Sequence, residues 1–272
     1  MFFCHLSKRQ LMKTSEELFD VQPISNPIPD RTNPREPIVV YFSGPIGAGK
    51  STLVIELELA LKPHFSVECA LEQVDLWKQC GIFDSFCRDP SRWAIEFQQY
   101  VMVTRVQQEL NMWRQNPNAD VYLVERSVFD DYFIFMRTLF ENGIVSAEQL
   151  QAYKNWWNMW VLLLPYKPSG FVWLHVSIDE LMRRVDKRNR ESESLIVTRE
   201  YQEQLISAHE LFFNRLETNP SSAGITNTVY VLQFDVEHDY RLCNVRKEQM
   251  CKTFVEWIGK IETSVCLNSD CT

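Results

Sequence analysis

The sequence predicts an α/β protein with a five-stranded parallel sheet flanked by helices. Five short runs are rich in β-branched and aromatic residues, stretches with helical spacing separate them, and a glycine-rich segment follows the first run. Strands that alternate with helices favour a parallel sheet, because parallel neighbours need a crossover connection. The expected strands are Ile38 to Phe42, Phe65 to Leu71, Val121 to Val124, Phe171 to Val176 and Val229 to Phe234.

A phosphate-binding loop is predicted at residues 44–51, where GPIGAGKS fits the pattern G-x-x-x-x-G-K-[ST] between an expected strand and an expected helix. Its glycines let backbone N–H groups converge on phosphate oxygens, Lys50 adds a cation, and the Ser51 hydroxyl can bind magnesium. The implied ligand is a nucleoside triphosphate. We assign phosphate binding to Gly44, Ile46, Gly47, Ala48, Gly49, Lys50, Ser51 and Thr52.

Two further helices are predicted by capping boxes. Ser146 with Gln149 and Ser177 with Glu180 have the spacing at which a serine caps a helix and the residue three positions later caps in return. The helices that follow are expected near 147–164 and 178–190.

Net charge, apolar runs and cysteine spacing exclude several classes of protein. The net charge of −8 excludes a general nucleic-acid binder, and no apolar run is long enough to span a membrane. The eight cysteines form neither a zinc pattern nor a disulfide framework. We expect a cytoplasmic protein; Lys8, Arg9 and Lys13 near the start leave mitochondrial targeting as the alternative.

One folded domain is expected at 37–261. Residues 1–36 are an expected irregular leader, since five prolines lie within 22–37. From 262 to 272 the apolar periodicity is lost, which predicts a flexible tail.

Polar residues follow two expected strands at the sheet edge where the phosphate loop lies. Glu72 can act as a general base for a hydroxyl that attacks phosphorus, although a solvated glutamate is the alternative. Glu125 can hold magnesium and Arg126 can neutralise developing charge; the alternative is a strand-end ion pair.

Two helices carry further candidate binding residues. Phe97, Gln98, Val101 and Arg105 share one helix face and suit a planar heterocycle, with ordinary packing as the alternative. The helix after Ser177 is rich in arginine, which suits polyphosphate; a solvated basic face is the alternative. Its candidate phosphate ligands are Arg184, Arg188 and Arg190.

Together these elements resemble the deoxyribonucleoside kinase family, which includes deoxycytidine, deoxyguanosine and mitochondrial-type thymidine kinases. The resemblance runs from about Ile38 to Tyr240. It rests on the phosphate loop, Glu72 to Trp77, Pro90 to Trp93 with Phe97 to Tyr100, Glu125 to Ser127, the arginine-rich segment and Asp235 to Tyr240.

The resemblance implies the P-loop kinase fold with an arginine-rich lid, a deoxynucleoside kinase domain at 37–261, and transfer of phosphate from ATP or another triphosphate. It implies that Glu72 is the general base for the 5′-hydroxyl, that Arg126 and Lys50 assist catalysis, and that Ser51 and Glu125 organise Mg²⁺. The implied nucleoside-binding residues are Trp77, Cys87, Phe97, Gln98, Val101, Arg105, Asp131 and Glu193, and the 235–240 loop with Asp239 and Tyr240 would hold the donor base.

Base preference is predicted from Arg105 and Asp131, a pair that resembles the deoxycytidine and deoxyguanosine kinases. Asp131 can accept a hydrogen bond from an exocyclic amine, which thymine lacks. We therefore expect deoxycytidine and purine deoxynucleosides to be preferred over thymidine. Two residues depart from the family pattern: Cys87 stands where a tyrosine usually contacts the sugar 3′-hydroxyl, and Gln73 replaces a frequent proline.

Two alternatives stay open, a nucleoside monophosphate kinase and a catalytically silent nucleotide-binding or structural subunit of the same fold. A homodimer is also expected, because related helices form dimer faces in the family. The matching segment here, Trp156 to Trp160, has core packing as its alternative.

Overall fold

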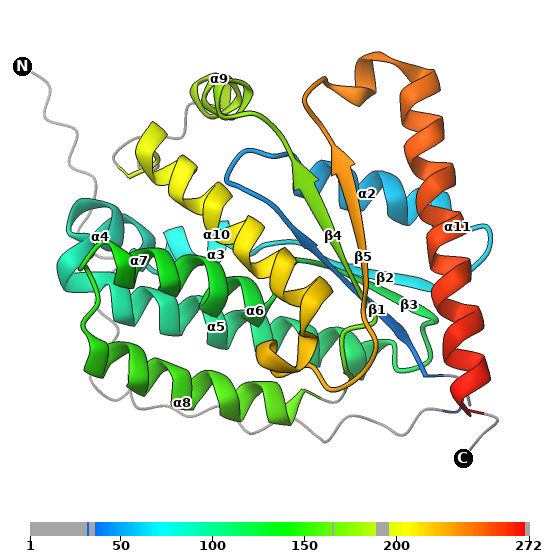
Figure 1. Ribbon diagram of the computed structural model, residues 1–272, viewed down its shortest axis with the longest axis horizontal. Helices are drawn as coiled ribbons and strands as arrows, with labels where there is room; N and C mark the ends of the chain where they lie inside the picture. Colours follow the sequence, from blue (N-terminus) through cyan, green and yellow to red (C-terminus); the bar gives the residue numbers. More distant parts are fainter. Residues whose placement is uncertain (1–31, 33–35, 165, 189–195, 270–272) are drawn as a thin grey trace, which may run out of the picture.

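The sheet of the computed structural model has five parallel strands in the order β2-β3-β1-β4-β5 (Figure 1). The structure describes residues 32, 36–164, 166–188 and 196–269. The carboxyl ends of the central strands β1 and β3 lie at one edge, since Phe42 pairs with Glu125 in register. The strands are β1 (Ile38–Ser43), β2 (Val67–Ala70), β3 (Val121–Glu125), β4 (Gly170–His175) and β5 (Tyr230–Asp235).

Helices cover both faces of this sheet (Figure 1). One face packs against α2 (Lys50–Leu61) and α11 (Asn244–Ser269), and the other against α5 (Pro90–Gln115) and α10 (Arg199–Thr218), with α8 (Ala147–Leu163) outside α5. The remaining elements are α3 (Val74–Gln79), α4 (Ile82–Arg88), α6 (Val128–Asp130), η2 (Asp131–Met136), α7 (Arg137–Glu141), α9 (Ile178–Arg188), η4 (Pro220–Ala223) and η5 (Tyr240–Leu242).

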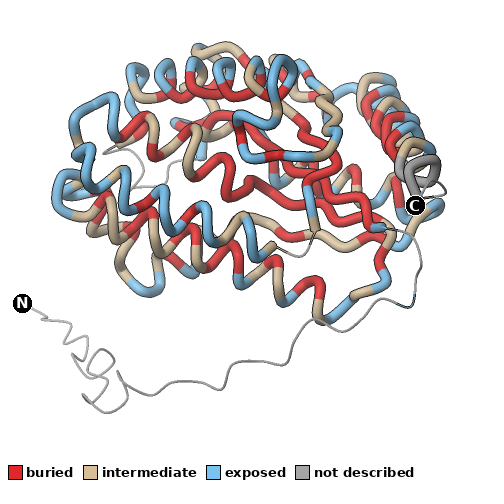
Figure 2. Tube along the Cα trace, turned by 60° about the horizontal axis from the view of Figure 1, so that its bottom comes forward, coloured by how far each residue is buried: buried red, intermediate tan, exposed pale blue. Residues whose placement is uncertain are grey.

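The strand residues divide between two cores by their alternation. In β1, Val39 and Tyr41 enter the core beneath α5 and α10, whereas Val40 and Phe42 enter the core beneath α2 and α11. Successive strand side chains point to opposite faces, so a strand that is covered on both faces is apolar throughout. Figure 2 shows the resulting layer of buried strands at the centre of the molecule.

All five strands lie where the sequence predicts them, with ends that differ by one or two residues. The capping box of α8 is confirmed, because the Ser146 hydroxyl accepts from the Gln149 N–H and Gln149 caps Ser146 in return. The box of α9 is only half correct. The Ser177 hydroxyl accepts from the Glu180 N–H, but the Ser177 N–H donates to Glu237.

The segment 262–272, predicted to be a flexible tail, begins as helix, and its flexibility stays a prediction. Helix α11 continues through residues 262–269 and ends at Ser269. Ile261 is fully buried, and residues 262–264, the last of this helix whose burial is described, are intermediate or exposed.

Candidate active site

A cavity of about 420 Å³ opens at the carboxyl edge of the sheet. Its wall combines the phosphate loop, the end of β3, one face of α5 and residues of α9 and α10. This is where open parallel sheets bind ligands. The cavity brings together most of the predicted site residues: Ile46, Gly47, Gly49, Lys50, Ser51, Thr52, Glu72, Trp77, Phe97, Gln98, Val101, Arg105, Glu125, Arg126, Asp131, Arg184 and Arg188.

The phosphate loop owes its path to glycine. Gly49, with φ +95°, precedes the first residue of α2 in a left-handed conformation that a side chain would strain. A Cβ at Gly44 would lie 3.0 Å from the carbonyl oxygen of Leu174, so a side chain there would press on β4. These constraints let the loop turn tightly against the sheet.

Lys50 is buried and folds back onto the loop. Its Nζ donates to the carbonyl oxygens of Gly44 and Pro45, each at 3.0 Å. Burial and the nearby charge of Arg126 together lower the pKa of Lys50 to about 7, while Glu125 and Glu72 oppose the shift. A phosphate would supply the negative charge that this ammonium group needs.

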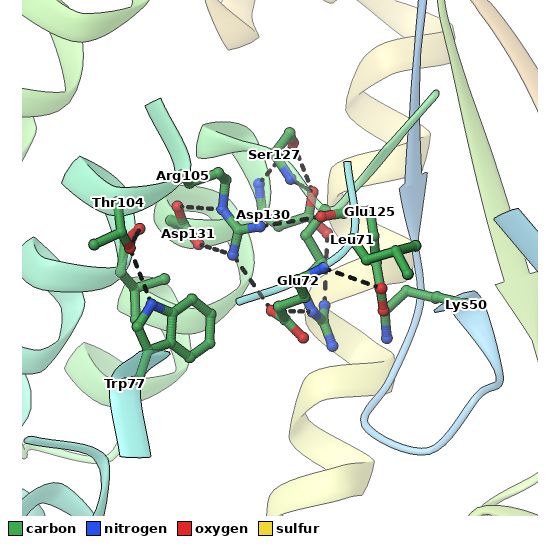
Figure 3. A network of polar contacts seen from close by, with 12 residues as sticks. Lys50, Leu71, Glu72, Trp77, Thr104, Arg105, Glu125, Ser127, Asp130 and Asp131 are labelled. Carbon is green, nitrogen blue, oxygen red and sulfur yellow. Dashed lines mark hydrogen bonds and ion pairs between the residues drawn. The ribbon is translucent and has the colours of Figure 1, made fainter. Parts of the chain in front are cut away.

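The carboxylate of Glu72 lies beside Arg105 (Figure 3), and it forms ion pairs with both Arg105 and Arg126. Its Oε1 lies 3.0 Å from Nε of Arg126 and accepts a 3.3 Å hydrogen bond from Nη2 of Arg105. Burial raises the pKa of Glu72, but Arg126, Arg105 and Lys50 outweigh burial and hold the pKa below its ordinary value. Glu72 is therefore ionised and can accept a proton.

Arg126 has a strained backbone, with φ +63° in the left-handed region. Its N–H donates to the Phe42 carbonyl at 2.8 Å, which joins the end of β3 to β1. The buried side chain lies over the ring of Phe135, 4.7 Å from its centroid, and 3.7 Å from a carboxylate oxygen of Asp130. These contacts fix the guanidinium group beside Glu72.

Ser51 and Glu125 form the candidate magnesium site. The Ser51 hydroxyl donates to Oε1 of Glu125 at 2.9 Å, and the Glu72 N–H donates to Oε2 of the same carboxylate at 3.2 Å. No cluster of three or more His, Cys, Asp or Glu side chains that suits a metal occurs in the described part of the chain. Mg²⁺ fits this site nonetheless, because it is commonly held by one carboxylate, a hydroxyl, waters and substrate phosphates.

The face of α5 supplies the opposite wall, where a planar ring would lie. Phe97 stacks on Phe86 with centroids 4.6 Å apart, and Trp77 donates from Nε1 to the Thr104 hydroxyl at 2.9 Å. Gln98 is 3% exposed, and its Oε1 has no hydrogen-bond partner among the described residues. A buried amide that lines a cavity with an unpaired oxygen is suited to a ligand that donates a hydrogen bond.

Arg105 and Asp131 both line the cavity and lie next to each other (Figure 3). Two nitrogens of Arg105 donate to the two oxygens of Asp131, at 3.1 and 3.2 Å. Burial raises the pKa of Asp131 to about 6, although Arg105 opposes the shift. Arg105 also donates to Glu72, so this one side chain joins Asp131 to the candidate base.

The arginines of α9 differ in their surroundings. Arg184 is bound to protein acceptors, since it donates to the carboxylate of Glu180 and to the carbonyl oxygens of Ala48, Val236 and Glu237. Arg188 also lines the cavity. Two predicted ligands, Arg190 and Glu193, lie outside the described residues.

The family model of the deoxynucleoside kinases matches residues 40–258, which is most of the chain. The chain belongs to the deoxynucleoside kinase family. It is therefore a kinase that phosphorylates deoxynucleosides, and the predicted family and fold are confirmed.

Curated relatives agree with this family. Deoxycytidine kinase 2 of Gallus gallus is 26% identical, with 78% of this chain and 86% of the relative covered. Deoxyguanosine kinase of Bacillus subtilis is 29% identical, with 69% and 84% covered. Human deoxycytidine kinase is 26% identical, with 74% and 85% covered.

Five residues predicted to bind substrates do not line the cavity of this kinase. Cys87 is buried in the core, and its neighbour Phe86 lines the cavity instead. Gly44 packs closely against Leu174 of β4, and Ala48 is buried. Asp239 and Tyr240 lie beyond β5, where Asp239 pairs with Arg241 and Tyr240 packs beneath α2 and α11.

Other residues of the site were missed from the sequence. Asp130 accepts hydrogen bonds from Ser43 and Ser127 and lies beside Arg126; the spacing of Ser127 and Asp130 as a capping box was the visible signal. Tyr201 lines the cavity, and Gln202 binds the phosphate loop. No sequence motif indicates either residue. They come from a helix about 150 residues beyond the loop, so only folding places them there.

Proposed function

We propose that this kinase transfers the terminal phosphate of ATP, or of another nucleoside triphosphate, to the 5′-hydroxyl of a deoxyribonucleoside. Deoxycytidine and purine deoxynucleosides are the preferred acceptors. The observation that carries the proposal is that one cavity is lined both by the phosphate loop and by an ionised carboxylate, Glu72. A phosphate donor and a hydroxyl acceptor can therefore meet there.

Glu72 is the proposed general base. The 5′-oxygen attacks the terminal phosphorus, its proton passes to Glu72, and the bond between that phosphorus and the bridging oxygen breaks to release the nucleoside diphosphate. Arg126 and Arg105 hold one oxygen of Glu72, at 3.0 and 3.3 Å, which orients the carboxylate. The gain comes mainly from positioning and from charge neutralisation, because phosphoryl transfer needs little else from the protein.

The phosphate loop, Lys50 and Arg188 are the proposed ligands of the triphosphate. When the triphosphate binds, Lys50 turns from the loop carbonyls to the phosphates. Their negative charge then favours the charged form of Lys50, which burial disfavours. Ser51 and Glu125 would hold Mg²⁺, which neutralises phosphate charge when bound. We place Asp239 and Tyr240 near the donor base on the basis of the sequence pattern. Arg184 supports this, because it links the phosphate loop to the carbonyl groups of Val236 and Glu237.

The base preference rests on Asp131 and Gln98. Besides its two hydrogen bonds from Arg105, the Asp131 carboxylate has lone pairs that can accept from the exocyclic amine of cytosine or adenine, and thymine has no such amine. The buried Oε1 of Gln98 has no partner among the described residues, so a base that donates to it is favoured. The relatives named for deoxycytidine and deoxyguanosine support this choice.

A radiolabelled phosphate-transfer assay with ATP and Mg²⁺ tests the proposal on the four natural deoxynucleosides and their 5′-monophosphates. We expect kcat/KM to be highest for deoxycytidine or a purine deoxynucleoside and lowest for thymidine. Thymidine as the best acceptor would refute the base preference. Faster transfer to the monophosphates than to the nucleosides would instead indicate a nucleoside monophosphate kinase.

We also propose a homodimer that forms through α8. Trp157 of this helix is buried in the core, whereas Trp156, Met159 and Leu162 are exposed. Light scattering on the full chain would give twice the monomer mass if the dimer forms.

For the cell we propose a cytoplasmic location, because scattered cysteines are typical of proteins kept in a reducing compartment. No helix in the described ranges is long and apolar enough to cross a membrane.

A further inference from the structure

Side-chain donors hold several carbonyl groups of the phosphate loop. Lys50 binds those of Gly44 and Pro45, and Arg184 binds that of Ala48 at 3.2 Å. A loop binds anions through its N–H groups only if its carbonyl dipoles point elsewhere. Each of these donors therefore helps to keep the loop in its anion-binding form.

Gln202 holds the peptide groups on both sides of Ile46, near the tip of the loop. Its Nε2 donates to the Ile46 carbonyl at 2.6 Å, and its Oε1 accepts from the Ile46 N–H at 3.3 Å. A glutamine amide can donate and accept at once without bringing a charge. Gln202 is fully buried, so water does not compete for these bonds.

The helix that carries Gln202 is firmly placed. The residue lies in the first turn of α10, where the Thr198 hydroxyl caps the helix by accepting from the Tyr201 N–H at 3.1 Å. Along the same helix Leu205, Ala208 and Phe212 are buried in the core. Gln202 thus connects the loop tip to a rigid part of the molecule.

Lys50 is a temporary partner of the loop. If it turns to the phosphates, the carbonyls of Gly44 and Pro45 lose the donor that holds them. The bonds from Gln202 to Ile46 do not need to break at that moment, because Gln202 carries no charge for phosphate to attract. The support that remains at the loop tip is then the one from α10.

We propose that Gln202 is a positioning residue for the triphosphate. It acts through the backbone of Ile46, whose position it fixes so that the neighbouring loop N–H groups can bind the phosphates, and it does not itself touch the substrate. This deepens the proposed function by adding a residue to its donor site. The binding of ATP alone can test it, because that measurement needs no phosphate transfer.

The test compares Gln202→Met with the wild type. Methionine keeps the length of the side chain and removes both hydrogen bonds. Calorimetric titration of the full chain with ATP and Mg²⁺ should show a Kd about tenfold higher, the change expected for one to two neutral hydrogen bonds. The Kd for deoxycytidine should change less than about twofold, because the bonds at Ile46 act on the phosphate side.

Gln204→Met is the matched control. Gln204 lies two residues along α10 and forms an exposed amide pair with Asn142, with both bonds at 2.8 Å. Its loss should leave both Kd values unchanged. Wild-type ATP binding by Gln202→Met would overturn the proposal, and so would an equal loss of deoxycytidine binding, which would indicate a general structural role.

A second variant covers the case in which Gln202→Met does not fold. Gln202→Glu keeps the acceptor for the Ile46 N–H and removes the donor to its carbonyl, so ATP binding should again weaken about tenfold or more. Unchanged ATP binding by this variant would overturn the proposal. If no deoxynucleoside is phosphorylated, the proposed function fails, but the ATP titrations still decide the role of Gln202.

Discussion

Nε of Arg126 lies 3.0 Å from Oε1 of Glu72. Arg105 donates to the same oxygen, and among the described residues no hydrogen bond or ion pair reaches Oε2. Both cations therefore act on one side of the carboxylate, which leaves its other oxygen for the acceptor hydroxyl. The arrangement orients the base and keeps it ionised at the same time.

The first prediction concerns the base itself. Glu72→Gln should lower kcat/KM by about 10²- to 10⁴-fold, because the amide cannot accept the proton. Circular dichroism should show a folded protein, since glutamine has nearly the same shape. Glu96→Gln, which removes an exposed ion pair with Arg92, is the control and should keep full activity. Near-normal turnover of Glu72→Gln would remove this residue from the mechanism.

The second prediction concerns base recognition. Asp131→Asn removes the acceptor charge and leaves the buried Arg105 without its bidentate partner. We expect kcat/KM for deoxycytidine to fall about 10- to 100-fold, in line with the loss of a buried charged hydrogen bond. Thymidine should lose less, because it gains nothing from the carboxylate. Equal losses for both nucleosides, measured beside an Asp179→Asn surface control, would contradict a role in base choice.

The third prediction concerns the sugar. Cys87 stands where the family pattern has a tyrosine, and in the structure it lies in the core and not in the cavity wall. We expect weak discrimination against sugars that lack a 3′-hydroxyl. The ratio of kcat/KM for 2′-deoxycytidine over 2′,3′-dideoxycytidine should stay below about 10², the range of one lost hydrogen bond. A ratio above about 10³ would show that another group binds the 3′-hydroxyl strongly.

The fourth prediction concerns stability and pH. Glu109 is fully buried beneath the sheet and accepts from the Tyr41 hydroxyl at 2.8 Å. Burial raises the pKa of Glu109 to about 7, although Tyr41 and Arg105 oppose the shift. A raised folded-state pKa means that the folded protein holds the proton more tightly. The resulting stabilisation is complete below the ordinary value of 4.5 and is lost as the pH rises through about 7.

Glu109→Gln should remove this dependence, because the amide stays neutral and still accepts from Tyr41. Between pH 5 and pH 8 the wild type should lose up to about 3 kcal/mol more unfolding free energy than the variant. Urea unfolding at the two pH values measures the difference. Glu141→Gln, which changes an exposed ion pair with Arg137, should follow the wild type. Parallel pH profiles for wild type and Glu109→Gln would contradict a neutral Glu109.

Much of the fold was predictable because its signals are local. Each strand is a short β-branched and aromatic run, and the run at Ile38 to Phe42 appears as β1 with one further residue. The helix after Ser146 begins at its capping box. The partner of Ser177 could not be predicted from its neighbours, because Glu237 lies 60 residues away and reaches the helix start only in the folded protein.

The sequence by itself determined the phosphate loop, the strand-end acids and the family of this protein, since all three depend on residue types at fixed spacing. Only the tertiary structure decided that Arg105 touches both Asp131 and Glu72 and that Arg184 binds the protein backbone. It also decided that Phe86, and not Cys87, lines the cavity. These relations depend on distances between segments far apart in the chain, and packing of the whole core sets those distances.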